Sequence, residues 1–187
     1  MTNQIYQIQI ALQGIKPKIW RRVIVNSDIL LVDFHRIIQT TMGWTNSHLH
    51  MFSDGTEKYS PGEFEVENAK DSRIVRLEEI LQGEKSTINY EYDFGDGWEH
   101  SIILEKIIPS NSQIQVPKCI EGERNCPPED CGGIHGYEIM LEILKQPDHE
   151  EYESYIEWMG GVYDPEYFNK DKVNKLLKRK DFGCIWL

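Results

Sequence analysis

Three of the four cysteines of this chain lie close together in the sequence, and two histidines could complete a metal site with them. Cys119, Cys126 and Cys131 are spaced C-x6-C-x4-C, His135 follows, and His100 precedes the group. Thiolates with one imidazole are the ligands of a tetrahedral zinc site, and the prolines and paired glycines in this stretch let a short loop curl around an ion. The sequence therefore predicts zinc held by the three cysteines with His100 or His135.

Two alternatives to zinc stay open for these cysteines. The spacing lacks the C-x2-C pair of a zinc knuckle, so the thiols could be reduced and buried in a rigid loop. Two of the three could instead form a disulfide, which the short loop permits. Cys184, close to the end of the chain, is expected to be a core thiol.

A second group of chemically capable side chains is acidic. Asp93, Asp96 and His100 surround one turn, and Glu129 and Asp130 follow two prolines. Paired carboxylates near a histidine can bind a hard cation or transfer protons, so the five residues together predict a metal-dependent hydrolase. The structural alternative is that the two aspartates of the turn accept hydrogen bonds from backbone N–H groups, while Glu129 and Asp130 cap the loop or the next helix.

A third candidate is the pair His48 and His50, on a strand predicted over residues 48–52. Side chains one residue apart on a strand project from the same face, which is a geometry that β-scaffolds use to bind metals. A polar strand face exposed to solvent has the same pattern, and this alternative also stays open. The aromatic residues around these candidates are expected to lie mostly in the core; they are Trp20, Trp44, Phe52, Tyr90, Tyr92, Phe94 and Trp98.

The elements that position these groups form a predicted α+β fold: a mainly antiparallel sheet from two hairpins plus a strand, one early helix, and a C-terminal cluster of helices. Period-two alternation predicts one hairpin over residues 6–12 and 19–25, and Asp96-Gly97 is the turn signal of a second hairpin over 88–93 and 98–106. Helical spacing predicts helices over 31–42, 76–81, 137–144, 152–159 and 173–177. Asp164 and Pro165 are read as the cap and first residue of the last helix.

The whole chain, 1–187, is expected to be a single domain. It divides into a sheet-rich part over 1–108, a Cys/Pro/Gly loop over 109–135 that begins with a polar linker at 110–113, and a helical part over 136–187. The polar segment 58–72 is interpreted as a surface loop or an excursion at the sheet edge.

Charge and composition exclude several classes of function. The 187 residues include 31 acidic and 20 basic side chains, for a formal net charge of -11. Such a charge repels nucleic-acid phosphate, so nucleic acid is a disfavoured partner, and the expected partner is an unknown protein or small ligand. No apolar run approaches the roughly 18 residues that span a bilayer, and the N-terminus lacks signal-peptide features, which predicts no membrane partner and a cytoplasmic location.

Several segments, taken in order, resemble a known family. They are IKPKIWRRVIV, FHRIIQTTMGW, HLHMF, YDFGDGWEHSIILE, CIEGERNCPPEDCGGIHGYE and the late YDPEYFN. Together they are similar to the plasmid pRiA open-reading-frame-three-like family, whose members are often labelled TnpR-like passenger proteins of transposable elements. The resemblance covers roughly residues 6–174 and implies an association with mobile elements, without implying a particular activity.

The resolvase label attached to such proteins is not supported by the residues. A serine recombinase needs a nucleophilic serine near its N-terminus with arginines around it and a basic helix-turn-helix. The first serine, Ser27, sits between a predicted strand and a predicted helix, and no basic recognition helix follows. The sequence thus favours a non-enzymatic binding or accessory module, with the metal-dependent hydrolase as the alternative.

Overall fold

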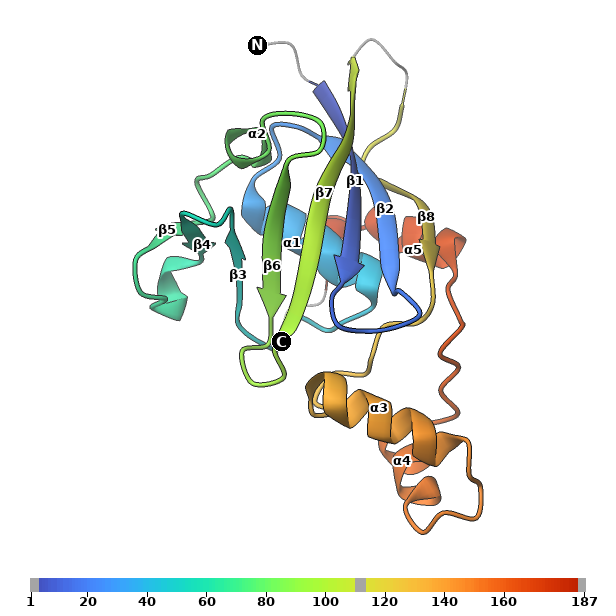
Figure 1. Ribbon diagram of the computed structural model, residues 1–187. Helices are drawn as coiled ribbons and strands as arrows, with labels where there is room; N and C mark the ends of the chain where they lie inside the picture. Colours follow the sequence, from blue (N-terminus) through green and yellow to red (C-terminus); the bar gives the residue numbers. More distant parts are fainter. Residues whose placement is uncertain (1–3, 110–113, 185–187) are drawn as a thin grey trace.

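The computed structural model describes residues 4–109 and 114–184, which build an eight-stranded sheet with helices on one face and at one end (Figure 1). In spatial order the strands are β5 (Ala69–Asp71), β4 (Lys58–Ser60), β3 (His50–Ser53), β6 (Thr87–Tyr92), β7 (Trp98–Pro109), β1 (Gln4–Leu12), β2 (Trp20–Asn26) and β8 (Lys118–Glu123). The helices are α1 (Leu31–Met42), α2 (Leu77–Ile80), α3 (Gly133–Leu144), α4 (Tyr152–Trp158) and α5 (Lys170–Leu177), with short 3-10 helices over Gly62–Phe64 and Lys180–Gly183. The predicted α+β class with a mainly antiparallel sheet is confirmed.

The first predicted hairpin is confirmed, with β1 and β2 paired antiparallel. In β1, Ile8 and Ile10 are fully buried while Gln7 and Gln9 alternate with them on the other face, as the period of two requires. On that outer face the chain places a polar cluster in which Glu105 accepts hydrogen bonds from Gln7, Gln9 and Arg22. One face of the sheet therefore carries the core and the other carries charged and amide groups.

Helix α1 covers the core face of the sheet and crosses behind its central strands (Figure 1). Its stripe of Leu31, Phe34, Ile37 and Ile38 is fully buried, because these positions repeat on one side of a 3.6-residue helix. The helix ends at Met42, as predicted, and its cap is Gly43, whose φ of 100° is a left-handed conformation that favours glycine. The chain then turns toward the candidate site.

The central hairpin of β6 and β7 is also confirmed. Trp98 pairs with Tyr92 across the turn, and both side chains are fully buried. Of the seven aromatic residues expected in the core, Trp44, Phe52 and Tyr90 are buried as well, whereas Trp20 is only half-buried and Phe94 is exposed at the tip of the turn. The exposed ring is explained by its place in the turn rather than in a strand.

The predicted strand over residues 48–52 is shifted. Strand β3 begins at His50, so His48 lies before the strand and is not a strand residue. The polar segment 58–72 forms β4 and β5, which pair in parallel and make one edge of the sheet, so the expected edge excursion includes two short strands. Their side chains are too polar for periodicity to have revealed them.

The second half of the chain shows three further differences. The segment expected as a Cys/Pro/Gly loop contains β8, which pairs with β2 and places Cys119 opposite Val23. Helix α3 starts at Gly133 rather than at residue 137. Helix α5 is capped by Asn169, whose Oδ1 accepts a hydrogen bond from the Lys172 N–H, so the predicted cap at Asp164 is wrong; Asp164 instead accepts from Glu166 N in a turn.

The predicted linker at 110–113 lies outside the described residues.

Helices α3 and α4 lie at the end of the sheet where the β1–β2 and β6–β7 turns are found (Figure 1). Within the described ranges, no helix combines the length and the apolar character needed to cross a bilayer.

Candidate functional site

The imidazole of His48 lies between two carboxylates that come from distant parts of the chain. Its Nδ1 is 3.7 Å from Oδ2 of Asp93, and its Nε2 is 3.3 Å from Oδ1 of Asp130. One ligand atom from each of the three residues lies within 4.8 Å of the others, and no other trio of His, Cys, Asp or Glu side chains in the described part of the chain meets this condition. We call these three residues the His48 cluster.

Local backbone structure explains how Asp93 is aimed. Its φ of 58° is left-handed, and Oδ1 accepts hydrogen bonds from the N–H groups of Gly95 and Asp96 in the turn after β6. This is the Asx geometry that aspartate favours in turns. Because Oδ1 is held by the turn, Oδ2 is the oxygen that faces His48.

The loop that carries Asp130 is docked against this turn. The N–H of Gly132 donates to Oδ2 of Asp96 at 3.2 Å. Gly133, at a φ of 67°, passes so close to the turn that a Cβ atom there would lie 2.5 Å from the carbonyl oxygen of Asp96. Only glycine allows this approach, and the approach sets the position of the neighbouring Asp130.

Glu129 fixes the same loop to the sheet from its other side. Its Oε1 accepts from the Tyr92 hydroxyl, and its Oε2 accepts from the backbone N–H and the hydroxyl of Thr45. The Tyr92 hydroxyl in turn accepts from the N–H of Ser47, next to His48. The loop, the chain before β3 and the end of β6 are thus joined by hydrogen bonds around the His48 cluster.

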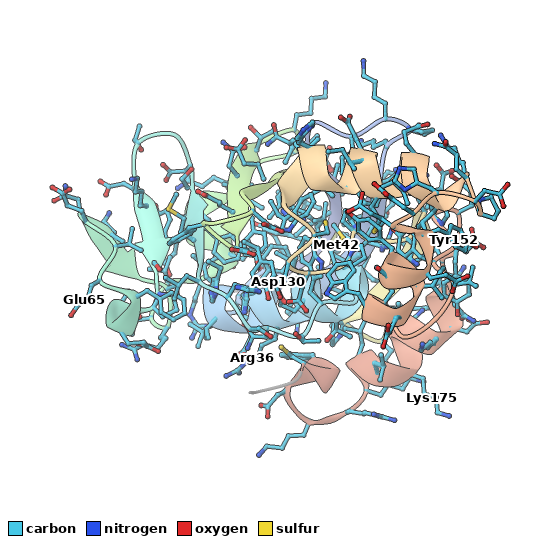
Figure 2. All side chains as sticks on the ribbon, turned by 90° about the horizontal axis from the view of Figure 1, so that it is seen from below. Arg36, Met42, Glu65, Asp130, Tyr152 and Lys175 are labelled. Atoms are coloured by element: carbon cyan, nitrogen blue, oxygen red, sulfur yellow. The ribbon has the colours of Figure 1, made fainter. Side chains whose placement is uncertain are left out.

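One imidazole nitrogen and two carboxylate oxygens are a ligand set for a divalent ion of intermediate hardness, such as Mn²⁺ or Zn²⁺. Cis ligands about 2.1 Å from such an ion are about 3 Å apart, close to the His48–Asp130 distance. The Asp130 side chain is 70% exposed while that of Asp93 is 11% exposed, so the cluster is walled on one side and open on the other. Figure 2, seen from below, places Asp130 near the middle of this end of the molecule.

A cleft of about 620 Å³ begins beside the cluster at Glu129. Its walls are the end of α1 with Trp44, the Pro127–Pro128 segment, and the end of α4 with the residues that follow it, from Trp158 to Tyr163. Trp44 donates from its indole N–H to the carbonyl of Pro127, which stabilises one wall. The cleft is therefore bounded by apolar and aromatic side chains with one carboxylate at its end, a composition typical of ligand sites.

Comparison with other proteins places this arrangement in a family. Residues 4–172 match the family described as plasmid pRiA4b ORF-3-like proteins. The chain belongs to this family. The match covers the three segments that contribute His48, Asp93 and Asp130, so the whole cluster lies inside the family domain, and the resemblance noted in the sequence is confirmed.

Two relatives of this family member extend the comparison. The chain is 38% identical over 190 residues to a protein of Sinorhizobium fredii (strain NBRC 101917 / NGR234), "Uncharacterized protein y4hQ", covering 100% of this chain and 96% of the relative. It also matches the crystal structure of the protein of unknown function MM3350 from Methanosarcina mazei Go1, with a TM-score of 0.81 and 36% identity over 91% of this chain and 98% of the other. Both descriptions leave the activity open.

The predicted zinc set is not assembled in this structure. Cys119, on β8, is fully buried and its thiol donates to the carbonyl of Glu121. Cys126 is buried, Cys131 is half-buried, and His135 is exposed on α3. Cys119, Cys126 and Cys131 are free thiols, and no three of the proposed ligands bring their ligating atoms within 4.8 Å of one another. The reason is that β8 holds Cys119 in the sheet, away from the loop around Cys131.

The structure brings together only two residues of the predicted acidic set. Asp93 and Asp130 come together, but through His48 rather than through His100. Asp96 and Glu129 are occupied by loop hydrogen bonds, as the structural alternative expected of such residues. His100 is fully buried, and its Nδ1 faces the carbonyls of Trp98 and Tyr90 at 3.0 and 3.3 Å, so it cannot meet a substrate in the cleft.

The two histidines of the predicted His48–His50 pair lie in different environments, because His48 belongs to the cluster and His50 lies in the core. The ring of His50 stacks on that of His35, with centroids 3.4 Å apart, inside the core. His35 donates from Nε2 to Asn46 Oδ1, which leaves Nδ1 to accept from the Tyr90 hydroxyl. Burial lowers the pKa of His35 to about 4 and that of His50 well below its usual value. The alternation of His48 and His50 was the sequence signal; the partner His35, on α1, carried none.

Proposed function

We propose that this protein is a cytoplasmic binding or accessory module that holds one divalent cation on His48, Asp93 and Asp130 and receives an unknown protein segment or small ligand in the adjoining cleft. The observation that carries the proposal is the convergence of three ligating side chains from three separated segments. The buried carboxylate of Asp93 is stabilised by a nearby positive charge, which a metal ion would supply, while the exposed side of the cluster at Asp130 would leave open coordination positions.

A binding role is favoured over catalysis because three groups of the suggested hydrolase are already committed. Asp96 and Glu129 hold loops together, and His100 lies in the core. The metal-dependent hydrolase remains the alternative, because a cation with an exposed carboxylate ligand could also activate water. Membership of the plasmid pRiA4b ORF-3-like family supports an association with plasmids, and we include transposable elements in the same proposal.

Manganese titration of chelator-treated protein tests the cation site. We expect one Mn²⁺ to bind per chain, followed by the loss of the free-ion signal in electron paramagnetic resonance. His48→Ala and Asp93→Asn should each weaken binding at least tenfold, because each removes one of three ligands. His135→Ala is the matched control, since this exposed histidine lies outside the cluster.

Two results would contradict the proposal. One is wild-type protein that binds neither Mn²⁺ nor Zn²⁺. The other is Zn²⁺ binding that survives His48→Ala but is lost in Cys126→Ser or His135→Ala, which would restore the cysteine site. Turnover of phosphate or carboxylate esters by the Mn²⁺-loaded protein, lost in His48→Ala, would favour the hydrolase.

A further inference from the structure

A second cavity, of about 360 Å³, adjoins the cleft, since Met42, Gly43 and Asn125 line both. Its remaining walls come from β2, the end of α1, the segment before α5, and α5 itself. Two basic side chains line it, Arg21 and Lys172, and none of its lining residues is acidic. In a chain with a formal net charge of -11, a cavity lined by basic but no acidic side chains is unusual.

Arg21 is the buried basic residue in the wall of this cavity. It is 1% exposed, and its guanidinium donates from Nε to the carbonyl of Thr41 and from Nη1 to the carbonyls of Trp20 and Glu123, each at 2.8 Å. The ring of Phe168 covers it, 4.1 Å from the guanidinium carbon. These contacts hold the group rigidly, and none of them neutralises its charge.

No carboxylate in the described ranges comes within 4.0 Å of this guanidinium, and no described residue accepts a hydrogen bond from its Nη2. The outward neighbour Arg22, by contrast, pairs with Glu105 and Glu121. The thiols of Cys119 and Cys126 lie near Arg21, but burial raises the pKa of Cys119 to about 11 and that of Cys126 further, so both are neutral at pH 7. Buried charges in proteins are normally paired, and Arg21 lacks a partner of opposite charge.

The N-terminus of α5 adds to the positive potential of the cavity. Asn169 and Lys172, the cap and a first-turn residue, line it, so the positive end of the helix dipole is at the wall. Met42, Val173 and Leu176 provide apolar surface beside these groups. The cavity wall therefore combines the buried guanidinium of Arg21, the ammonium group of Lys172 and the N-terminus of α5 with apolar side chains.

We infer that this cavity binds a small organic anion, whose phosphate or carboxylate group pairs with Arg21 and Lys172 while its apolar body contacts Phe168, Val173 and Leu176. The planar guanidinium with a remaining N–H edge suits an oxyanion better than a point charge would. This site uses none of the residues of the His48 cluster, so it stands independently of the proposed cation.

Thermal unfolding and calorimetry with two probes, phenyl phosphate and benzoate, test the site. At constant ionic strength set with sodium chloride, we expect at least one probe to raise the Tm of the wild-type protein in a saturable way, because the ligand binds only the folded chain. Stabilisation by phenyl phosphate alone assigns a phosphate ligand, and stabilisation by benzoate alone assigns a carboxylate.

Variants at the exposed lysines of α5 locate the effect without disturbing the core. Lys172→Gln should weaken binding of the effective probe about five- to tenfold. Lys175 (Figure 2) is on the same helix but does not line the cavity, so Lys175→Gln should leave binding unchanged. Arg21→Lys should abolish the Tm increase while keeping a positive charge. The inference is overturned if neither probe stabilises the wild-type protein, or if Lys172→Gln and Lys175→Gln respond alike.

Discussion

The hydroxyl of Tyr92 donates a hydrogen bond to Oε1 of Glu129 at 2.5 Å, across thirty-seven positions of the chain. Burial and this carboxylate both raise the pKa of Tyr92, so the hydroxyl keeps its proton. The contact joins the last residue of β6 to the loop that carries Asp130. It is therefore the link between the sheet and the outermost ligand of the His48 cluster.

Replacing Glu129 by Gln should lower the free energy of unfolding by about 1–3 kcal/mol. An amide offers only one acceptor oxygen, so either Tyr92 or the Thr45 N–H loses its partner. Urea unfolding measures the loss, and Glu138→Gln, on the exposed side of α3, should stay within about 0.5 kcal/mol of wild type. If Glu129→Gln and Tyr92→Phe are additive in the double variant, the two side chains do not act as a unit.

Gly133→Ala should separate the loop from the turn after β6. The new Cβ would lie 2.5 Å from a backbone oxygen that cannot move aside, so we expect a loss of about 2–4 kcal/mol and weaker Mn²⁺ binding. Gly55→Ala is the control: Gly55 also has a positive φ, of 93°, but open space around it, so its cost should be about 1 kcal/mol with no change in Mn²⁺ binding. Equal losses in the two variants would show that the close approach to Asp96 is unimportant.

Trp98→Ala should cost about 3–5 kcal/mol, because the ring is fully buried and its removal leaves a cavity in the core. Trp158→Ala is a useful comparison, since Trp158 is 47% exposed and should cost less than about 1 kcal/mol. Chemical denaturation of both variants gives the two values. A Trp98→Ala protein as stable as Trp158→Ala would mean that the central hairpin does not carry the core.

Stability should fall as the pH is lowered from about 6.5 toward 4. Burial lowers the pKa of His35 and His100 to about 4 and that of His50 well below its usual value. In this window the unfolded chain takes up protons that the folded chain excludes, so each buried histidine removes on the order of 1.4 kcal/mol per pH unit.

Urea unfolding at several pH values checks this dependence. His100→Gln should reduce the slope by about one histidine, because one of the three buried imidazoles is gone. His135→Gln should leave the slope unchanged, since His135 is exposed on α3. A wild-type stability that is constant between pH 6.5 and 4.5 would contradict the neutral, buried state of these rings.

Much of the fold was determined by local pattern. The hairpin strands alternate strictly, α1 carries a complete apolar stripe, and Gly43 and Asp96-Gly97 mark a helix end and a turn with backbone angles that other residues adopt poorly. Strands β4, β5 and β8 escaped this pattern because they are short or polar and form only by pairing with a neighbour already in place.

The amino-acid types show which ligating groups this chain has, but long-range packing brings particular ones together. Spacing drew attention to Cys119, Cys126 and Cys131, yet β8 pairs with β2 and keeps Cys119 in the sheet. His48, Asp93 and Asp130 are too far apart in the chain for any spacing rule to join them. They meet because the chain before β3, the turn after β6 and the glycine-rich loop are held at one end of the sheet by long-range hydrogen bonds, and such contacts leave no local pattern in the sequence.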